Sequence, residues 1–289
     1  MKTRSKIWLG VGAFVIAGAN PSAAEAPALD PLAKAASVSD LALTRALIPM
    51  QVAAAKKHKH GDESGEGGEE GGAKGAKLPP DLDFALKIAQ IRGHLVVGDE
   101  LVKAGQWAAA LPHFLHPSEE IYGGIRGRLK DYNAPQFATA LKLLVTTVKS
   151  KKDGEDYAKA WKAVEDGLGA ADAGVKGKQK GDGFVVESAL ELLKSATGEY
   201  QQAIVKGRIA KPVEYQDARG YVWQAEKMIE SVAPALEKKD AEALKHVRDA
   251  LADLKKAWPS AMAPKTPVKD YAAVLSDVSR IELSAGKLM

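Results

Sequence analysis

Two histidines are followed closely by two glutamates in a short stretch of this sequence. His113 and His116 stand just before Ser118-Glu119-Glu120, and His94 lies about twenty residues upstream. Imidazole nitrogen and carboxylate oxygen are ligands for iron and zinc, and imidazole also suits copper. A helical bundle builds metal sites from such side chains on facing helices. The spacing predicts a metal site, with iron favoured over zinc or copper, formed by His94, His113, His116, Glu119 and Glu120.

The same histidines have a structural interpretation. His94 stands beside Ile91 and Leu95, at the margin of an apolar helix face, where it would be a hydrogen-bonded core residue. His113 and His116 are bracketed by prolines and would be surface or capping residues. On this interpretation the three histidines are dispersed in space.

A second group of acidic residues lies further along the chain, at Glu199, Glu214 and Asp217. Glu214 and Asp217 are three residues apart and therefore share a helix face, and Arg219 is close enough to pair with a carboxylate. Helical sequence of this kind is typical of a solvated, salt-bridged helix face.

The amino-acid composition is typical of an all-α protein, so helices must position these residues. Ala, Leu, Lys and Glu dominate, and β-branched alternation is nearly absent. Apolar residues stepping by three, four or seven from Phe84 to Val102 predict a long amphipathic helix that ends near Gly105. Prolines, glycines and Asp240, a predicted helix cap, divide the rest. We predict two four-helix halves, residues 81–173 and 184–289, joined by a polar linker at 174–183.

The N-terminal residues have the pattern of a secretory signal peptide. Lys2, Arg4 and Lys6 precede the apolar run Ile7–Ala19, which is shorter than the roughly 20 residues of a membrane-spanning helix. Small residues then allow cleavage after Ala24. We therefore expect residues 1–24 to be a signal peptide and the mature protein to be periplasmic, without membrane insertion.

Two further segments precede the main body. Residues 25–56 predict a helical segment that is interrupted at Pro49. Residues 57–80 are rich in Gly and Glu and predict a disordered linker. The pair His58 and His60 within that linker is interpreted as part of a flexible spacer, with loose metal capture as the alternative.

Charge and motifs exclude several classes of function. Removal of residues 1–24, with three basic and no acidic side chains, lowers the formal net charge from +4 to +1. A nearly neutral chain does not have the charge that binding to nucleic-acid phosphates requires. The chain has no cysteine, so it forms neither disulfides nor thiolate metal sites. Motifs for hydrolases, nucleotide binding and dinucleotide binding are absent, and we predict no enzymatic activity.

A family resemblance lies in the C-terminal part. Tyr200-Gln201-Gln202-Ala203, Lys206-Gly207-Arg208-Ile209 and then Glu214-Tyr215 at the start of a long helix are the residues that carry it. They resemble the periplasmic helical domain joined to some bacterial high-affinity iron permeases, over residues 185–284. The chain departs from that family in lacking the permease's membrane helices and its Arg-Glu-x-x-Glu motif. The resemblance implies a free-standing partner of an inner-membrane metal permease. It also implies that Glu199, Glu214 and Asp217 are candidate acidic contacts for the metal.

Together these features predict a periplasmic helical protein that binds a metal ion, iron above all, and acts in metal uptake or delivery. The alternative hypothesis, from a different class, is a non-catalytic structural or protein-interaction bundle of the cell envelope. The first hypothesis requires His94 to lie near His113 and His116, whereas the second predicts that the three histidines are dispersed.

Overall fold

The computed structural model describes residues 77–178 and 180–289. The predicted signal peptide (1–24), the helical segment (25–56) and all but the last residues of the linker (57–80) lie outside the described residues. Within the described part, nearly every element is a helix, which confirms the all-α prediction. That part of the chain contains no helix that is both long and apolar enough to cross a membrane.

Helix α1 (Pro80–Lys103) is buried on more than one side. Proline in its first turn fits there because the first N–H groups of a helix have no intrahelical partner. The residues that predicted a single apolar face are buried, namely Phe84, Ile88, Ile91, Leu95 and Val102, but Ala89 is buried as well. The first group belongs to one hydrophobic cluster and Ala89 to another. α1 thus packs against both hydrophobic clusters.

The first cluster is built mainly from the helices that follow α1 in the chain. Prolines 112 and 117 divide residues 107–132 into short pieces, as predicted, and two longer helices complete the cluster. The elements are α2 (Trp107–Ala110), α3 (Pro112–His116), the π-helix η1 (Pro117–Ile121), α4 (Tyr122–Arg126), the 3₁₀ helix η2 (Leu129–Tyr132), α5 (Ala138–Lys149) and α6 (Gly154–Gly177).

The second cluster is formed mainly by the C-terminal helices. These are α7 (Asp182–Ala203), α8 (Pro212–Ser231), α9 (Ala233–Lys255) and α10 (Tyr271–Ala285). α9 is kinked at Asp240, whose side chain accepts a hydrogen bond from the backbone N–H of Ala243 at 2.9 Å. The predicted capping role of Asp240 is therefore confirmed.

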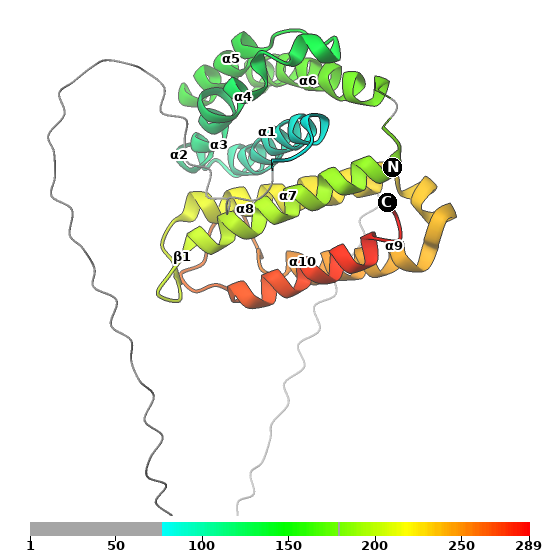
Figure 1. Ribbon diagram of the computed structural model, residues 1–289. Helices are drawn as coiled ribbons and strands as arrows, with labels where there is room; N and C mark the ends of the chain where they lie inside the picture. Colours follow the sequence, from blue (N-terminus) through cyan, green and yellow to red (C-terminus); the bar gives the residue numbers. More distant parts are fainter. Residues whose placement is uncertain (1–76, 179) are drawn as a thin grey trace, which may run out of the picture. The chain divides into compact units, whose positions relative to one another are not determined.

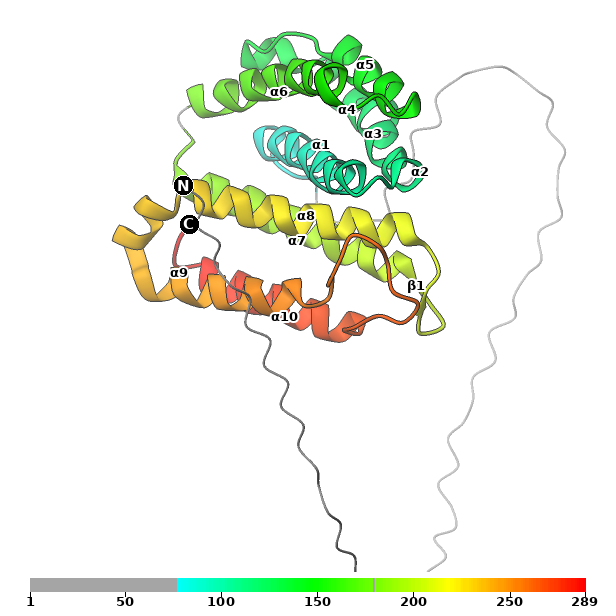
Figure 2. The same ribbon diagram turned by 180° about the vertical axis from the view of Figure 1, so that it is seen from behind.

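These helices lie in layers around α1. Figure 1 shows α1 between the helices α5 and α6 on one side and the pair α7 and α8 on the other, with α9 and α10 beyond that pair. The reverse view in Figure 2 shows the same order. All of these elements belong to one compact unit.

A short hairpin follows α7. The helix ends at Ala203, and the strands β1 (Ile204–Val205) and β2 (Arg208–Ile209) pair in antiparallel fashion. The turn residues of the hairpin, Lys206 and Gly207, have φ values of 51° and 73°. A two-residue turn in which both φ values are positive matches the right-handed twist of the two strands that it connects. Lys206 and Gly207 form such a turn, so the helix ends before them.

The predicted linker 174–183 is shorter than expected. α6 continues to Gly177 and α7 begins at Asp182. A Cβ atom at Gly174 would lie 1.9 Å from the carbonyl oxygen of Tyr132. Gly174 is therefore a packing position in a helix, where the absence of a side chain permits close contact, and not a helix breaker.

Candidate metal centre

Three helices bring four of the predicted site residues together. α1 supplies His94, α3 supplies His113 and His116, and α8 supplies Asp217. His113 and His116 are three residues apart on a helix and so face the same way. We call these four residues, His94, His113, His116 and Asp217, the His–Asp cluster.

The carboxylate of Asp217 is the centre of the cluster. Its Oδ1 atom lies 2.7 Å from Nδ1 of His94 and 2.7 Å from Nδ1 of His113. Its Oδ2 atom lies 3.4 Å from Nδ1 of His116. One ligand atom each from His94, His113 and Asp217 lie within 4.8 Å of one another, close to the spacing of about 3–4 Å expected for ligands of one ion.

Neighbouring side chains fix the orientation of His113. The Nε2 atom of Gln216 donates a hydrogen bond to the carbonyl oxygen of Ala261 at 3.1 Å, which determines which end of the amide is oxygen. The Oε1 atom of Gln216 then accepts from Nε2–H of His113 at 2.9 Å. In a neutral imidazole this arrangement leaves Nδ1 with a lone pair directed at the Asp217 carboxylate.

His94 has a similar arrangement. Its Nε2 atom lies 2.9 Å from the hydroxyl of Tyr221. Its Nδ1 atom is buried and, among the described residues, has no partner in hydrogen-bond geometry, although Asp217 Oδ1 is only 2.7 Å away. Two imidazole nitrogens and a carboxylate oxygen therefore face one another, an arrangement that needs either protons or a bound cation between them.

Burial and charge act in opposite directions on Asp217. Burial alone would raise the pKa of this carboxyl, but the charge of His94 and the hydrogen bonds of His113 and His116 outweigh it and hold the pKa well below its ordinary value. The Asp217 carboxyl therefore stays ionised although it is buried.

His116 is the least buried of the three histidines. It is 28% exposed, whereas His113 is fully buried. The hydrogen bond with Asp217 raises the pKa of His116 against the effect of its partial burial, and the charges of Asp217, Glu120 and Glu199 add to the increase. Solvent therefore reaches the cluster on the side of His116.

The other predicted residues lie at varying distances from the cluster. Glu120 is exposed, with an oxygen 4.0 Å from Nε2 of His116, and Glu199 is near enough to act on the charge of His116. Glu119 is exposed and makes no hydrogen bond or ion pair with any described residue. Glu214 forms an ion pair with Lys211 at 3.5 Å.

Arg219 pairs with a carboxylate, as predicted, and that carboxylate is Glu100. Its Nε and Nη2 atoms each lie 2.9 Å from a Glu100 oxygen, and Nη1 donates to the carbonyl of Trp258 at 2.8 Å. This pair links α1 to α8 beside the cluster.

Several residues that matter for the site were not predicted. Gln216 and Tyr221 orient the imidazoles, and Gly93 and Gly220 allow α1 and α8 to cross closely. A Cβ atom on Gly220 would lie 2.2 Å from the carbonyl oxygen of Gly93. The sequence offered one indication of this close crossing: a glycine directly precedes His94, and a second glycine lies three positions after Asp217.

The π-helix η1 begins directly after His116. π-helical turns are uncommon and are found frequently at functional sites. Here the wider turn follows two histidines of the cluster and carries Glu119 and Glu120 toward solvent.

Fold and cluster together define an all-α protein with buried imidazole and carboxylate groups between packed helices. Residues 176–289 match the model of a family described as the iron permease-associated 4-helix bundle domain. The matched part contains α7 to α10, and the resemblance predicted for the C-terminal half is confirmed. No curated protein and no solved structure shows significant similarity to the chain.

The family match includes only part of the His–Asp cluster. Asp217 lies within residues 176–289, whereas His94, His113 and His116 precede them. The cluster therefore combines one residue of the matched domain with three from the preceding helices.

Proposed function

We propose that this protein binds a transition-metal ion, iron above all, at the His–Asp cluster and acts in metal uptake or delivery together with a metal permease. The observation that carries the proposal is the set of two imidazole nitrogens and one carboxylate oxygen within 4.8 Å in a buried position. The match of residues 176–289 to the iron permease-associated domain supports the partner. The pattern of residues 1–24 supports a periplasmic location.

The donor set favours particular metals. Two imidazoles and one carboxylate form a set typical of non-haem iron, and zinc also accepts it. Copper(I) prefers thiolate and thioether sulfur, and the chain has no cysteine. The partly exposed His116 is placed to complete the coordination or to accept the ion from solvent.

Metal titration of the mature chain tests the binding step. His58→Ala and His60→Ala are introduced first, so that the N-terminal histidines do not compete. Ferrous, ferric, zinc and cupric ions are then titrated by calorimetry. We expect one tight site per chain, and His113→Gln to weaken it by about 100-fold or more, because even outer partners of a metal site contribute 10–100-fold.

His246→Gln is the matched control, since His246 is exposed on α9 and outside the cluster. Unchanged affinity in His113→Gln, or the absence of a tight site, would contradict the proposal. Those results would instead support a structural bundle in which the cluster is only a hydrogen-bonded network.

The transport step needs a separate test in the native host. Deletion of the gene should slow growth under iron limitation, and the wild-type chain and His246→Gln should restore it. If His113→Gln restores growth equally well, metal binding at the cluster is not what the cell requires from this protein.

A further inference from the structure

A cavity of about 560 Å³ lies between α1, α6, α7 and α8, outside the His–Asp cluster. We call it the four-helix cavity. Its volume falls within the 300–1,000 Å³ that small-molecule sites usually have. Arg92 in its wall is two residues from His94 on α1, and Gln224 follows Asp217 by two turns of α8. The two sites therefore use the same helices at different points.

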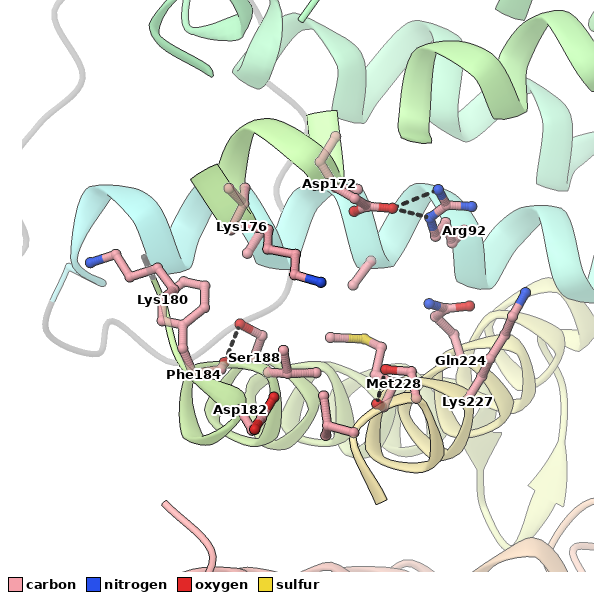
Figure 3. Close-up of a pocket in the computed structure, with 17 residues that line it drawn as sticks. Arg92, Asp172, Lys176, Lys180, Asp182, Phe184, Ser188, Gln224, Lys227 and Met228 are labelled. Carbon is pink, nitrogen blue, oxygen red and sulfur yellow. Dashed lines mark hydrogen bonds and ion pairs between the residues drawn. The ribbon is translucent and has the colours of Figure 1, made fainter. Parts of the chain in front are cut away.

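One part of the wall is apolar. Ile88 and Ala89 of α1 are buried there, and Phe184, Val185 and Met228 contribute half-buried surface. Figure 3 shows the Met228 thioether and the Phe184 ring among the side chains that line the space. Such a wall stabilises the hydrocarbon part of a ligand by removing it from water.

Another part of the wall carries cations, and some of them are already paired: Lys180 lies 3.0 Å from Asp81. Four cations, Arg92, Lys176, Lys180 and Lys227, line the cavity with two carboxylates, Asp172 and Asp182. Arg92 is already neutralised, since Asp172 and Glu165 each lie 2.7 Å from it. Among the described residues, neither Lys176 nor Lys227 has an ion-pair partner within 4 Å.

Gln224 supplies a hydrogen-bonding group that the protein does not use. Its side chain is only 4% exposed, and its Oε1 atom has no hydrogen-bond partner among the described residues. Figure 3 shows the amide of Gln224 among the side chains around the space, near Arg92 and Lys227 in the view. The Oε1 atom can only accept a hydrogen bond, whereas the Nε2–H group of the same amide can donate to an anionic ligand.

We infer that the four-helix cavity binds an organic carboxylate with an apolar body. The carboxylate lies between Lys176 and Lys227, the apolar body lies against Ile88, Phe184 and Met228, and the Nε2–H group of Gln224 donates a hydrogen bond to the carboxylate. This site is separate from the proposed metal centre, and its occupation requires no metal.

Three probes of the same shape and different charge test this inference. Phenylbutyrate is the anionic probe, phenylbutanol the neutral one and phenylbutylamine the cationic one. Binding to the mature chain is followed by NMR of ¹³C-labelled methionine methyl groups. Met228 lines the cavity, and Met262, which is half exposed and not in its wall, is the internal control.

We expect phenylbutyrate to shift the Met228 signal and leave Met262 in place, with an affinity about tenfold higher than that of phenylbutylamine. The modest factor reflects two ionic contacts at a partly exposed site, where solvent screens the charges. An unmoved Met228 signal, or equal affinity for the anionic and cationic probes, would overturn the inference.

Variants then assign the contacts. Lys176→Met/Lys227→Met keeps the aliphatic stems and should weaken phenylbutyrate about tenfold without affecting phenylbutanol. Lys149→Met, at an exposed position of α5 outside the cavity, should change neither. Gln224→Leu should weaken phenylbutyrate without lowering the melting temperature, because no internal hydrogen bond of Oε1 is lost. Equal binding by the double lysine variant and the wild type would contradict the assigned contacts.

Discussion

Asp217 determines whether the three histidines form a site or only neighbouring rings. It is the one carboxylate in contact with all of His94, His113 and His116. The sequence did not distinguish Asp217 from Glu199 and Glu214, because all three were equivalent candidates on their helices. What distinguishes Asp217 is burial: it is 3% exposed, whereas Glu214 is accessible enough to pair with Lys211 at the surface.

Asp217→Asn should therefore lower metal affinity by about 100-fold or more while preserving the side-chain shape. Competition with a chromophoric zinc chelator measures the change. Asp277→Asn is the matched control, since Asp277 is also buried but pairs with Lys269 and Arg280, away from the cluster. The role assigned to Asp217 is wrong if both variants retain wild-type affinity.

The pair formed by His116 and Asp217 should make the stability of the metal-free protein depend on pH. The raised pKa of His116 gives a contribution that is complete below its unfolded value and is lost as the pH rises through the folded value. The lowered pKa of Asp217 gives a contribution present above its unfolded value and lost in acid. Both contributions are present between about pH 4 and pH 6.5.

Urea unfolding of wild type and His116→Gln, with a chelator present, measures this effect. The difference between their free energies of unfolding should be largest near pH 5.5 and smaller at pH 8.5. A difference that is constant across this range would show that the His116–Asp217 contact does not titrate as described.

At the scale of the elements, the cluster depends on the crossing of α1 and α8. Gly93 and Gly220 let the two backbones approach, with Tyr221 packed against Gly93. Arg219 and Glu100 hold the same helices together beside the crossing. The histidine of α1 and the aspartate of α8 are neighbours because no side chain separates the helices at this point.

Gly220→Ala should therefore destabilise the protein by about 1–3 kcal/mol, because the added methyl group meets the backbone of Gly93. It should also weaken metal binding by separating His94 from Asp217. Gly169→Ala is the control: Gly169 is in α6, and a Cβ atom there would meet nothing within 4 Å. This control should stabilise the protein by up to about 1 kcal/mol through its higher helix propensity.

Thermal melts and metal titrations of both glycine variants test the importance of the crossing. If Gly220→Ala melts like the wild type and binds metal equally well, the close approach of α1 and α8 does not determine the site.

The elements themselves were largely predictable because helices depend on local sequence. The period from Phe84 to Val102 predicted α1, Pro212 predicted the start of α8 and Asp240 predicted a cap. The hairpin at Lys206 was missed, because a lysine with positive φ leaves little trace in the sequence. Gly174 was misinterpreted because a glycine that permits packing and a glycine that ends a helix look alike before the contacts are known.

The composition of the site was less predictable than its elements. The histidines were named from their spacing, yet their meeting with Asp217 joins residues more than 100 positions apart. Such a contact depends on how the helices pack, and local periodicity in the sequence does not reveal that. The four-helix cavity was not predicted for the same reason, since its wall combines residues of α1, α6, α7 and α8.

At the scale of the whole molecule, the cluster connects the iron permease-associated part to the helices before it. Asp217 belongs to residues 176–289, and the histidines belong to α1 and α3. α1 also contributes to both hydrophobic clusters. We therefore expect residues 77–289 to unfold in one cooperative transition, and a metal ion at the cluster to stabilise the helices on both sides of α1 together.

At a free metal concentration of 100 times Kd, binding to the native state alone adds about 2.7 kcal/mol to the free energy of unfolding. Far-ultraviolet circular dichroism should show a single melting transition that moves to higher temperature, and Asp217→Asn should remove the shift. Hydrogen exchange should show increased protection in both α3 and α8, since each supplies ligands to the same ion. Protection confined to α8, or two separate transitions, would mean that the matched domain is stabilised without the preceding helices. In that case the ion would not join the two parts through the His–Asp cluster.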